Sequence, residues 1–182
     1  GNHPVRIFYI QKGKVKTFKT NDDGKELTVA LFGEGDYVGY TAILEGTIYK
    51  ETAEAIEDTT LAIIDREEFE KLLLTKKKVA QQFIQLLAQS VTDREKQLVG
   101  IAYNSLRKRV AETLVLLKTK YTKDNKGNFS IHISREDLAH IAGTATESII
   151  RTLSDFKNER LIDIKEGAII ILDEKRLAEL LN

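Results

Sequence analysis

The segment from Ile133 to Leu153 constrains the fold most, because it carries the signals of two short helices joined by a tight turn. Ser134 is placed to cap the first helix, and Asp137 stands where a capping box has its acid. Gly143 can adopt the left-handed conformation that ends this helix, and Thr144 is expected to cap the second one. The residues expected to face inward are apolar: Leu138, Ala139, Ile141, Ile149, Ile150 and Leu153.

Two apolar strands follow this helix pair at once. They span Arg160–Ile164 and Ala168–Leu172, and Lys165–Gly167 forms the turn between them. A helix pair followed at this spacing by a β-hairpin predicts a winged helix-turn-helix, which places its second helix in the major groove of DNA. The elements expected ahead of the pair are a helix from Ser105 to about Thr119, a polar turn at Tyr121–Phe129 and a strand at Ile131.

Residues near the start of the second helix are expected to meet base edges. Arg151 can donate two parallel hydrogen bonds to guanine, and Glu147 can accept one from the amino group of cytosine. Thr146 and Ser148 are the other candidates for base reading. Two plainer interpretations stay open: Glu147 could only complete a capping box with Thr144, and Arg151 could only form a surface ion pair.

Contacts to DNA phosphates are expected from Ser134, Arg135, Thr144 and Lys165. The overall charge gives no further support, because the chain has 28 basic and 28 acidic residues. After Asn104 there are 14 basic and 12 acidic residues. Any DNA binding must therefore depend on a few well-placed cations and on shape.

The chain contains no cysteine, which excludes disulfides, thiolate metal sites and cysteine-ligated iron–sulfur clusters. Its histidines, His3, His132 and His140, are scattered, so no metal site is expected. No apolar run is long enough to cross a bilayer, and no signal-peptide pattern opens the chain. These features predict a soluble, cytoplasmic protein.

Residues 1–64 read as short strands separated by glycine turns, which predicts a β-sandwich or roll. Asn21–Gly24 is a strong hairpin turn, because its residues tolerate positive φ. Leu27–Phe32 is expected to follow as a buried strand, with Gly33–Asp36 as the next turn. Leu61–Ile64 is expected to close the set.

Residues 65–104 are predicted to be helical, with Asp65 as an N-cap and a long helix from about Lys76. Apolar positions in the long helix recur at three and four residues, as in a coiled-coil seam. They are Val79, Phe83, Leu86, Leu87, Val91, Leu98 and Ile101. This stripe favours pairing with a second copy of the helix, although a helix packed on its own sheet would show the same pattern.

Several segments resemble the superfamily of the cyclic-AMP receptor protein and Fnr (Crp/Fnr), which are bacterial transcription regulators. Tyr9–Lys16 is similar to the family's strand-turn-strand, and Gly33–Gly39 to its glycine-aspartate turn. Arg107–Leu114 resembles the first helix of its DNA-binding domain, and the pair Glu147 and Arg151 matches its recognition helix. The resemblance covers nearly the whole chain.

The resemblance implies an α+β chain with a partial β-roll (jelly-roll) of the cyclic-nucleotide-binding type at 1–64. A short helix and a long dimerisation helix follow at 65–104, and a winged helix-turn-helix at 105–182. It also implies a homodimer on double-stranded DNA with two-fold-related half-sites, in contact with RNA polymerase. The residues assigned to the dimer helix are Val79, Phe83, Leu86, Leu87, Ser90 and Gln97.

The family further implies an effector chamber in the roll, with four candidate residues: Tyr40, Thr41, Lys50 and Arg94. Tyr40 stands where cyclic-nucleotide binders have the glutamate for the ribose hydroxyls, and Glu51 beside Lys50 would oppose an anion. Cyclic AMP is therefore not the expected effector, and a regulator without any effector stays open. The family's first strands are missing before Gly1, so a chain shortened at its N-terminus is expected.

Two other functions stay open. A winged helix can bind a protein instead of DNA, although the polar set Thr146, Glu147, Ser148 and Arg151 favours DNA. A β-roll metalloenzyme would need histidine and carboxylate ligands clustered on its strands, and the roll offers His3 alone. No enzymatic activity is expected.

Overall fold

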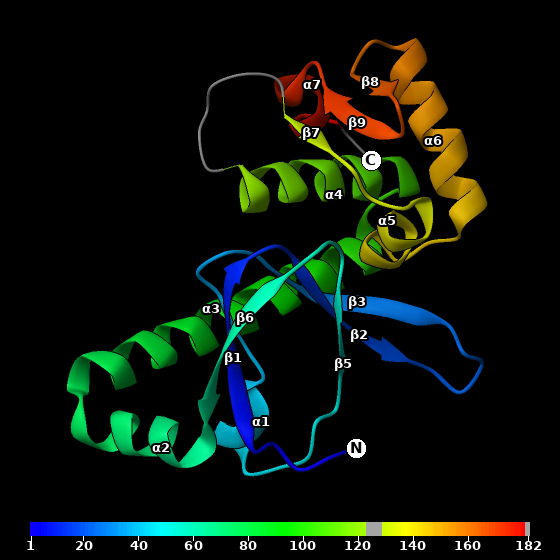
Figure 1. Cartoon of the computed structure of the whole chain (residues 1–182). Helices are drawn as coiled ribbons and strands as arrows, with labels where there is room; N and C mark the ends of the chain where they lie inside the picture. Colours follow the sequence, from blue (N-terminus) through cyan, green and yellow to red (C-terminus); the bar gives the residue numbers. More distant parts are fainter. Residues whose placement is uncertain (123–128, 181–182) are drawn as a thin grey trace. The chain divides into compact units, whose positions relative to one another are not determined.

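The computed structural model describes residues 1–122 and 129–180, and Figure 1 labels its helices and strands. The fold is α+β, as predicted from the sequence. It divides into two units, Gly1–Gly24 with Val29–Gln97 and Lys25–Thr28 with Leu98–Asn182. Within the described ranges, no helix is both long enough and apolar enough to cross a membrane.

The strands before residue 66 form two antiparallel sheets. In one sheet, β1 lies between β4 and β6, with Ile7 opposite Ile64. In the other, β2 lies between β3 and β5, with Thr17 opposite Ala53. The strands are β1 (Arg6–Lys12), β2 (Val15–Thr20), β3 (Glu26–Phe32), β4 (Tyr37–Val38), β5 (Thr52–Ala55) and β6 (Thr60–Asp65).

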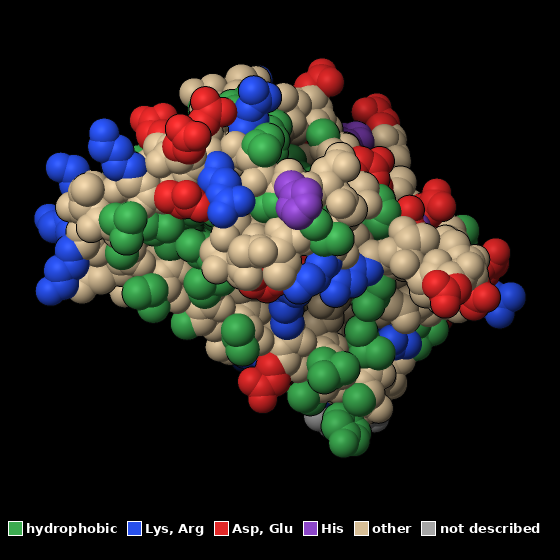
Figure 2. Space-filling model, turned by 90° about the horizontal axis from the view of Figure 1, so that it is seen from below, with side chains coloured by type: hydrophobic (Ala, Val, Ile, Leu, Met, Phe, Trp, Pro, Cys, Tyr) green, Lys and Arg blue, Asp and Glu red, His purple; other side chains and the backbone are tan. Residues whose placement is uncertain are grey.

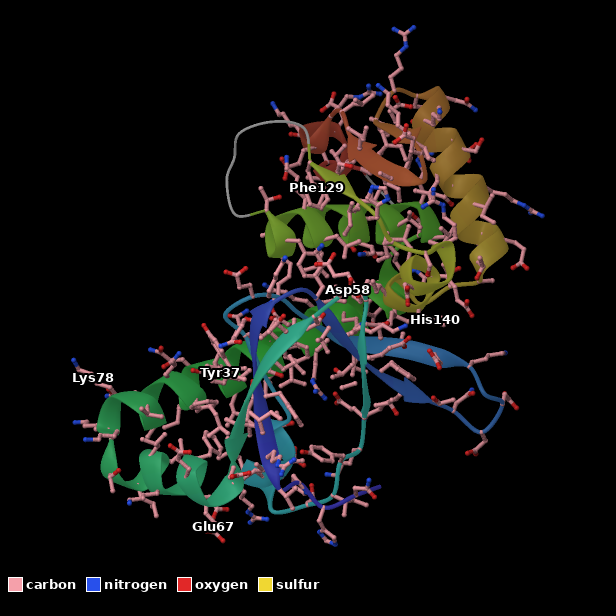
Figure 3. The ribbon with its side chains drawn as sticks, in the orientation of Figure 1. Tyr37, Asp58, Glu67, Lys78, Phe129 and His140 are labelled. Atoms are coloured by element: carbon pink, nitrogen blue, oxygen red, sulfur yellow. The ribbon has the colours of Figure 1, made fainter. Side chains whose placement is uncertain are left out.

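The turn between β1 and β2 depends on Gly13, whose φ is 100°. A Cβ atom here would lie 2.4 Å from Oγ1 of Thr59 and 2.7 Å from the carbonyl oxygen of Asp58, which Figure 3 labels. A larger residue would therefore force the turn away from the loop before β6. The predicted hairpin turn at Asn21–Gly24 forms between β2 and β3, where the Gly24 N–H donates to the Asn21 carbonyl at 3.0 Å.

Two expectations for the roll are wrong. Residues Tyr40–Glu45 form a short helix, α1, between Gly39 and Gly46, which both have positive φ. The helix forms because it buries Tyr40 and Ile43 in the core. Leu27–Phe32 is not a buried strand: among its side chains only that of Thr28 is buried, and the others are half-buried on a strand at one edge of the sheet.

The core of the roll gathers around Phe83, which is 4% exposed. Its ring lies 4.8 Å from that of Phe69, 5.1 Å from that of Tyr37 and 5.3 Å from that of Tyr40, between ring centres. Figure 3 labels Tyr37 in this region. Ile7 from β1 belongs to the same cluster, so the long helix packs directly on its own roll.

Two helices follow β6: α2 (Arg66–Thr75) and α3 (Lys77–Tyr103). Asp65 occupies the N-cap position of α2 as predicted, but its side chain does not cap the helix and instead pairs with Nε of Arg6 at 3.2 Å. Lysine and arginine side chains gather at the end where α2 meets α3 (Figure 2), where Figure 3 labels Lys78. Lys76, Lys77 and Lys78 are all exposed there.

The first helix that lies wholly in the second unit is α4 (Leu106–Tyr121), which Ser105 caps by accepting a hydrogen bond from the Lys108 N–H at 3.3 Å. Most of the predicted polar turn at Tyr121–Phe129, residues 123–128, lies outside the described residues. The later elements are β7 (Ser130–Ile131), α5 (Arg135–Ala142), α6 (Thr146–Asn158), β8 (Ile162–Lys165), β9 (Ala168–Ile171) and α7 (Glu174–Ala178). Strand β9 lies between β7 and β8.

Candidate nucleic-acid interface

Helix α5 forms as the sequence predicts. The Ser134 hydroxyl accepts a hydrogen bond from the Asp137 N–H at 2.9 Å and donates to the Asp137 carboxylate at 2.7 Å. Leu138 and Ala139 are fully buried, which allows α5 to pack closely on its neighbours. Gly143 ends the helix with a φ of 64°, in the left-handed region.

A side chain of α4 holds the turn between α5 and α6 in place. Nη1 of Arg109 donates to the carbonyl oxygen of Gly143 at 3.0 Å. A Cβ atom on Gly143 would lie 3.4 Å from Cδ1 of Ile101, in a conformation that side chains rarely adopt. The direction in which α6 leaves the turn is thus set by a glycine, an arginine and an isoleucine.

Helix α6 begins one residue later than predicted. Ala145, not Thr144, occupies its N-cap, and no side chain caps the helix there. The capping box that would explain Glu147 is therefore not formed. Ile150 is 52% exposed and was wrongly predicted to be buried, whereas Ile149 and Leu153 are buried as expected. The buried face is narrower than the run of apolar residues suggests.

The outward face of α6 presents polar side chains. Glu147 and Arg151 are exposed and one helical turn apart, while Thr146 and Ser148 are half-buried. Within the described residues, neither Glu147 nor Arg151 takes part in a salt bridge, so Arg151 has no surface ion pair there. Both side chains are free to meet a ligand.

The four candidates for phosphate contact differ in exposure and in the hydrogen bonds that they already make. The Ser134 hydroxyl is already used in its cap. Thr144 and Arg135 are half-buried, and burial lowers the pKa of the Arg135 guanidinium. Lys165 is accessible, with 71% of its side chain exposed.

Replacing Ser134 with alanine removes the cap of α5, and we expect the free energy of unfolding to fall by about 1 kcal/mol. Urea denaturation measures this change. Ser154→Ala, at an exposed serine within α6, is the matched control and should have almost no effect. If the Ser134 variant kept full stability but bound DNA more weakly, the hydroxyl would be a phosphate ligand rather than a cap.

The hairpin after α6 has the geometry of a wing. Glu166 and Gly167 have φ values of 48° and 81°, the pattern of a two-residue type I′ turn. Nζ of Lys165 lies 3.6 Å from Asp163, whose other oxygen lies 3.2 Å from Nζ of Lys157. The Ile164 N–H and Lys157 hold the pKa of the Asp163 carboxyl below its usual range. Lys165 is therefore loosely held beside the turn.

Three of the four effector candidates, in the roll or on α3 beside it, are engaged with other groups. Tyr40 is buried in the core, and this burial raises the pKa of its hydroxyl. Thr41 is half-buried. Nζ of Lys50 lies 2.8 Å from Glu45, and Nη2 of Arg94 lies 2.8 Å from Glu51. Each of the two cations is thus neutralised by a carboxylate of the same chain.

Four of the six residues assigned to the dimer helix pack on the core of the roll. The assignment of Phe83 to the dimer contact is wrong, because its ring is buried in the core of the roll and cannot reach a partner. Val79, Leu86 and Leu87 pack against the same core, and Ser90 and Gln97 are half-buried.

A different apolar stripe of α3 is open to solvent. Ile84, Val91 and Leu98 are 65%, 66% and 68% exposed and recur every seven residues. The stripe begins about 100° around the helix from Phe83. Ile84 was missed at the sequence level, although its seven-residue spacing from Val91 was the signal that could have added it to the stripe.

Two family models match the chain. One, described as the cyclic nucleotide-binding domain, matches residues 1–76, and the other, described as the Crp-like helix-turn-helix domain, matches residues 108–180. The chain belongs to the Crp/Fnr family of transcription regulators. The second match spans α5, α6 and the wing, so this region is a DNA-binding helix-turn-helix domain.

Individual relatives support the same family. The cyclic AMP receptor protein of Thermus thermophilus is 28% identical over 174 residues, 96% of this chain and 78% of that protein. The anaerobic regulatory protein of Bacillus subtilis is 26% identical over 178 residues, 96% of this chain and 75% of that protein. The structure of FixK2 from Bradyrhizobium japonicum shares the fold, with a TM-score of 0.86 at 22% identity, over 97% of this chain and 87% of that one.

These relatives are regulators of transcription and not enzymes, which decides against a β-roll metalloenzyme. Among the described residues, no group of three or more histidine, cysteine, aspartate or glutamate side chains is arranged to hold a metal ion. The Crp-like domain match likewise decides against a winged helix that binds only protein.

Proposed function

We propose that this Crp/Fnr regulator binds DNA as a homodimer, with α6 of each copy in the major groove of one half-site. The single observation that carries the proposal is the exposed pair Glu147 and Arg151 on α6. A dimer seam on the exposed stripe of α3 is the second part of the proposal. The bound dimer would then present its surface to RNA polymerase.

The roles on DNA follow from chemistry. The Arg151 guanidinium can donate two hydrogen bonds to O6 and N7 of guanine, and the Glu147 carboxylate can accept one from the amino group of cytosine. Each such contact discriminates between bases by about 1–3 kcal/mol. Thr146 and Ser148 border them, and Lys165 on the wing, Arg135 and Thr144 supply contacts to phosphates, which fix the register without reading sequence.

The dimer part rests on the stripe of Ile84, Val91 and Leu98. Large apolar side chains that are about two-thirds exposed and spaced by seven residues lose hydration when a second helix covers them. A parallel pair of α3 helices would relate the two recognition helices by a two-fold axis. This symmetry predicts a DNA site with two-fold-related halves.

The proposal includes no cyclic nucleotide. A cyclic phosphate needs an unpaired cation, but Lys50 is held by Glu45 and Arg94 by Glu51. Tyr40 fills the core where a ribose-binding carboxylate would otherwise stand. We therefore infer that DNA binding does not depend on cyclic AMP.

Selection of bound sequences from a pool of random DNA tests the proposal at a stated salt concentration. We expect a short motif repeated with two-fold symmetry, with centres separated by one helical turn of about 34 Å or a multiple of it. Cyclic AMP should change neither the motif nor the affinity. Enrichment of a single unpaired motif would refute the dimer, and the absence of any motif would refute sequence-specific binding.

A further inference from the structure

A salt bridge joins the long helix α3 to the roll at Arg94. Nη2 of Arg94 lies 2.8 Å from Oε1 of Glu51, which immediately precedes β5. The side chain of Arg94 is 43% exposed, whereas that of Glu51 is only 20% exposed. Burial raises the pKa of the Tyr40 hydroxyl, and the charge of Arg94 partly opposes this rise, so the guanidinium lies close to the roll.

Arg94 lies at the boundary between the exposed stripe of α3 and the side that faces the roll, one heptad after Leu87, which packs against the core. It follows Val91 by three residues and precedes Leu98 by four, which is the spacing of the second core position of a heptad. In a parallel helix pair, residues at that position face their own copies across the two-fold axis. Two guanidinium groups would therefore approach each other in an otherwise apolar seam.

An unpaired charge at this place weakens a dimer in two ways. The two like charges repel each other, and each loses hydration when the apolar stripe is covered. A carboxylate of the same chain removes the first effect and offsets the second, because the ion pair as a whole is neutral. Glu51 is already positioned at 2.8 Å before any partner arrives.

We propose that Glu51 is a built-in counter-ion for Arg94, through which the roll sets the strength of the α3 dimer. The inference rests on the proposed dimer. It gives the segment before β5 a regulatory role, since any displacement of Glu51 exposes the charge of Arg94 to its copy. The roll would then control pairing of α3 without a ligand touching that helix.

Glu51→Gln removes the counter-ion and keeps the shape of the side chain. We expect the dissociation constant of the dimer to rise by about tenfold or more, measured by sedimentation equilibrium. Glu70→Gln is the matched control, because it breaks another arginine–glutamate contact of the first unit, at 2.7 Å from Arg66, and should leave the dimer unchanged. Circular dichroism checks that each variant is folded.

Arg94→Met separates this role from a structural one. It replaces the cation with an apolar side chain of similar length, and we expect a dimer at least as tight as wild type. In this background Glu51→Gln should have no further effect on the dimer. The inference is overturned if Glu51→Gln dimerises like wild type, if it weakens the dimer equally with methionine at position 94, or if Arg94→Met alone weakens it tenfold.

Different results would show that the proposed α3 dimer itself is wrong. Should the wild-type protein sediment as a monomer, or should Val91→Lys leave its dimer intact, the proposed α3 seam is wrong. A dimer that Val91→Lys breaks and Glu51→Gln leaves unchanged overturns the counter-ion alone.

Discussion

Replacing Val91 with lysine is expected to yield a monomer that binds a two-half-site DNA about 100-fold or more weakly than wild type. Val91 is the middle residue of the exposed stripe, between Ile84 and Leu98. In a parallel helix pair each new ammonium group would lie near its copy, where it loses hydration and meets a like charge. DNA binding suffers because a monomer loses the effective concentration that links the two half-sites.

Gln82→Lys is the matched control for this prediction. It adds the same charge to an exposed position of α3, on the side of the helix opposite Val91. Sedimentation equilibrium measures the dimer, and fluorescence anisotropy with a labelled duplex measures DNA affinity at fixed salt. We expect Gln82→Lys to behave like wild type in both. If Val91→Lys and Gln82→Lys changed dimerisation and DNA affinity equally, α3 would pair through some other face or not at all.

The helix-turn-helix could be predicted from the sequence because its signals are local. The Ser134 cap, the left-handed Gly143 and the buried Leu138 are each determined by neighbours a few residues away. The same local reasoning placed Glu147 and Arg151 on the outer face of α6. It misplaced the cap by one residue, because Thr144 and Ala145 are both compatible with a helix start and only Thr144 has a capping side chain.

The face of α3 that meets the roll could not be predicted in the same way. This helix has one apolar side that packs on the core through Phe83 and another, at Ile84 and Val91, that is exposed. Periodicity detects both and does not say which is covered, because that depends on strands far away in sequence. The contact between Arg94 and Glu51 has the same origin, since the two residues are 43 positions apart.

Replacing Arg151 with alanine is expected to weaken binding to the selected DNA site by about 1–3 kcal/mol per half-site, or about 2–6 kcal/mol where both halves add. Arg151 is exposed on α6, one turn after Glu147, and within the described residues it forms no salt bridge that would hold it back. Its loss removes two hydrogen bonds to one guanine in each half-site. Discrimination at that base pair should therefore disappear, while the dimer remains intact.

Lys175→Ala is the control, because it removes a positive charge from an exposed position on α7 of the same domain. Competition with duplexes that carry each base pair in turn measures discrimination, and a salt titration measures the number of phosphate contacts. We expect Lys175→Ala to keep the base preference. Arg151→Ala could instead keep the base preference and lose affinity equally for every sequence. Arg151 would then be a phosphate ligand and not a base reader. In that case Glu147 would remain the candidate for selecting a base pair near the start of α6.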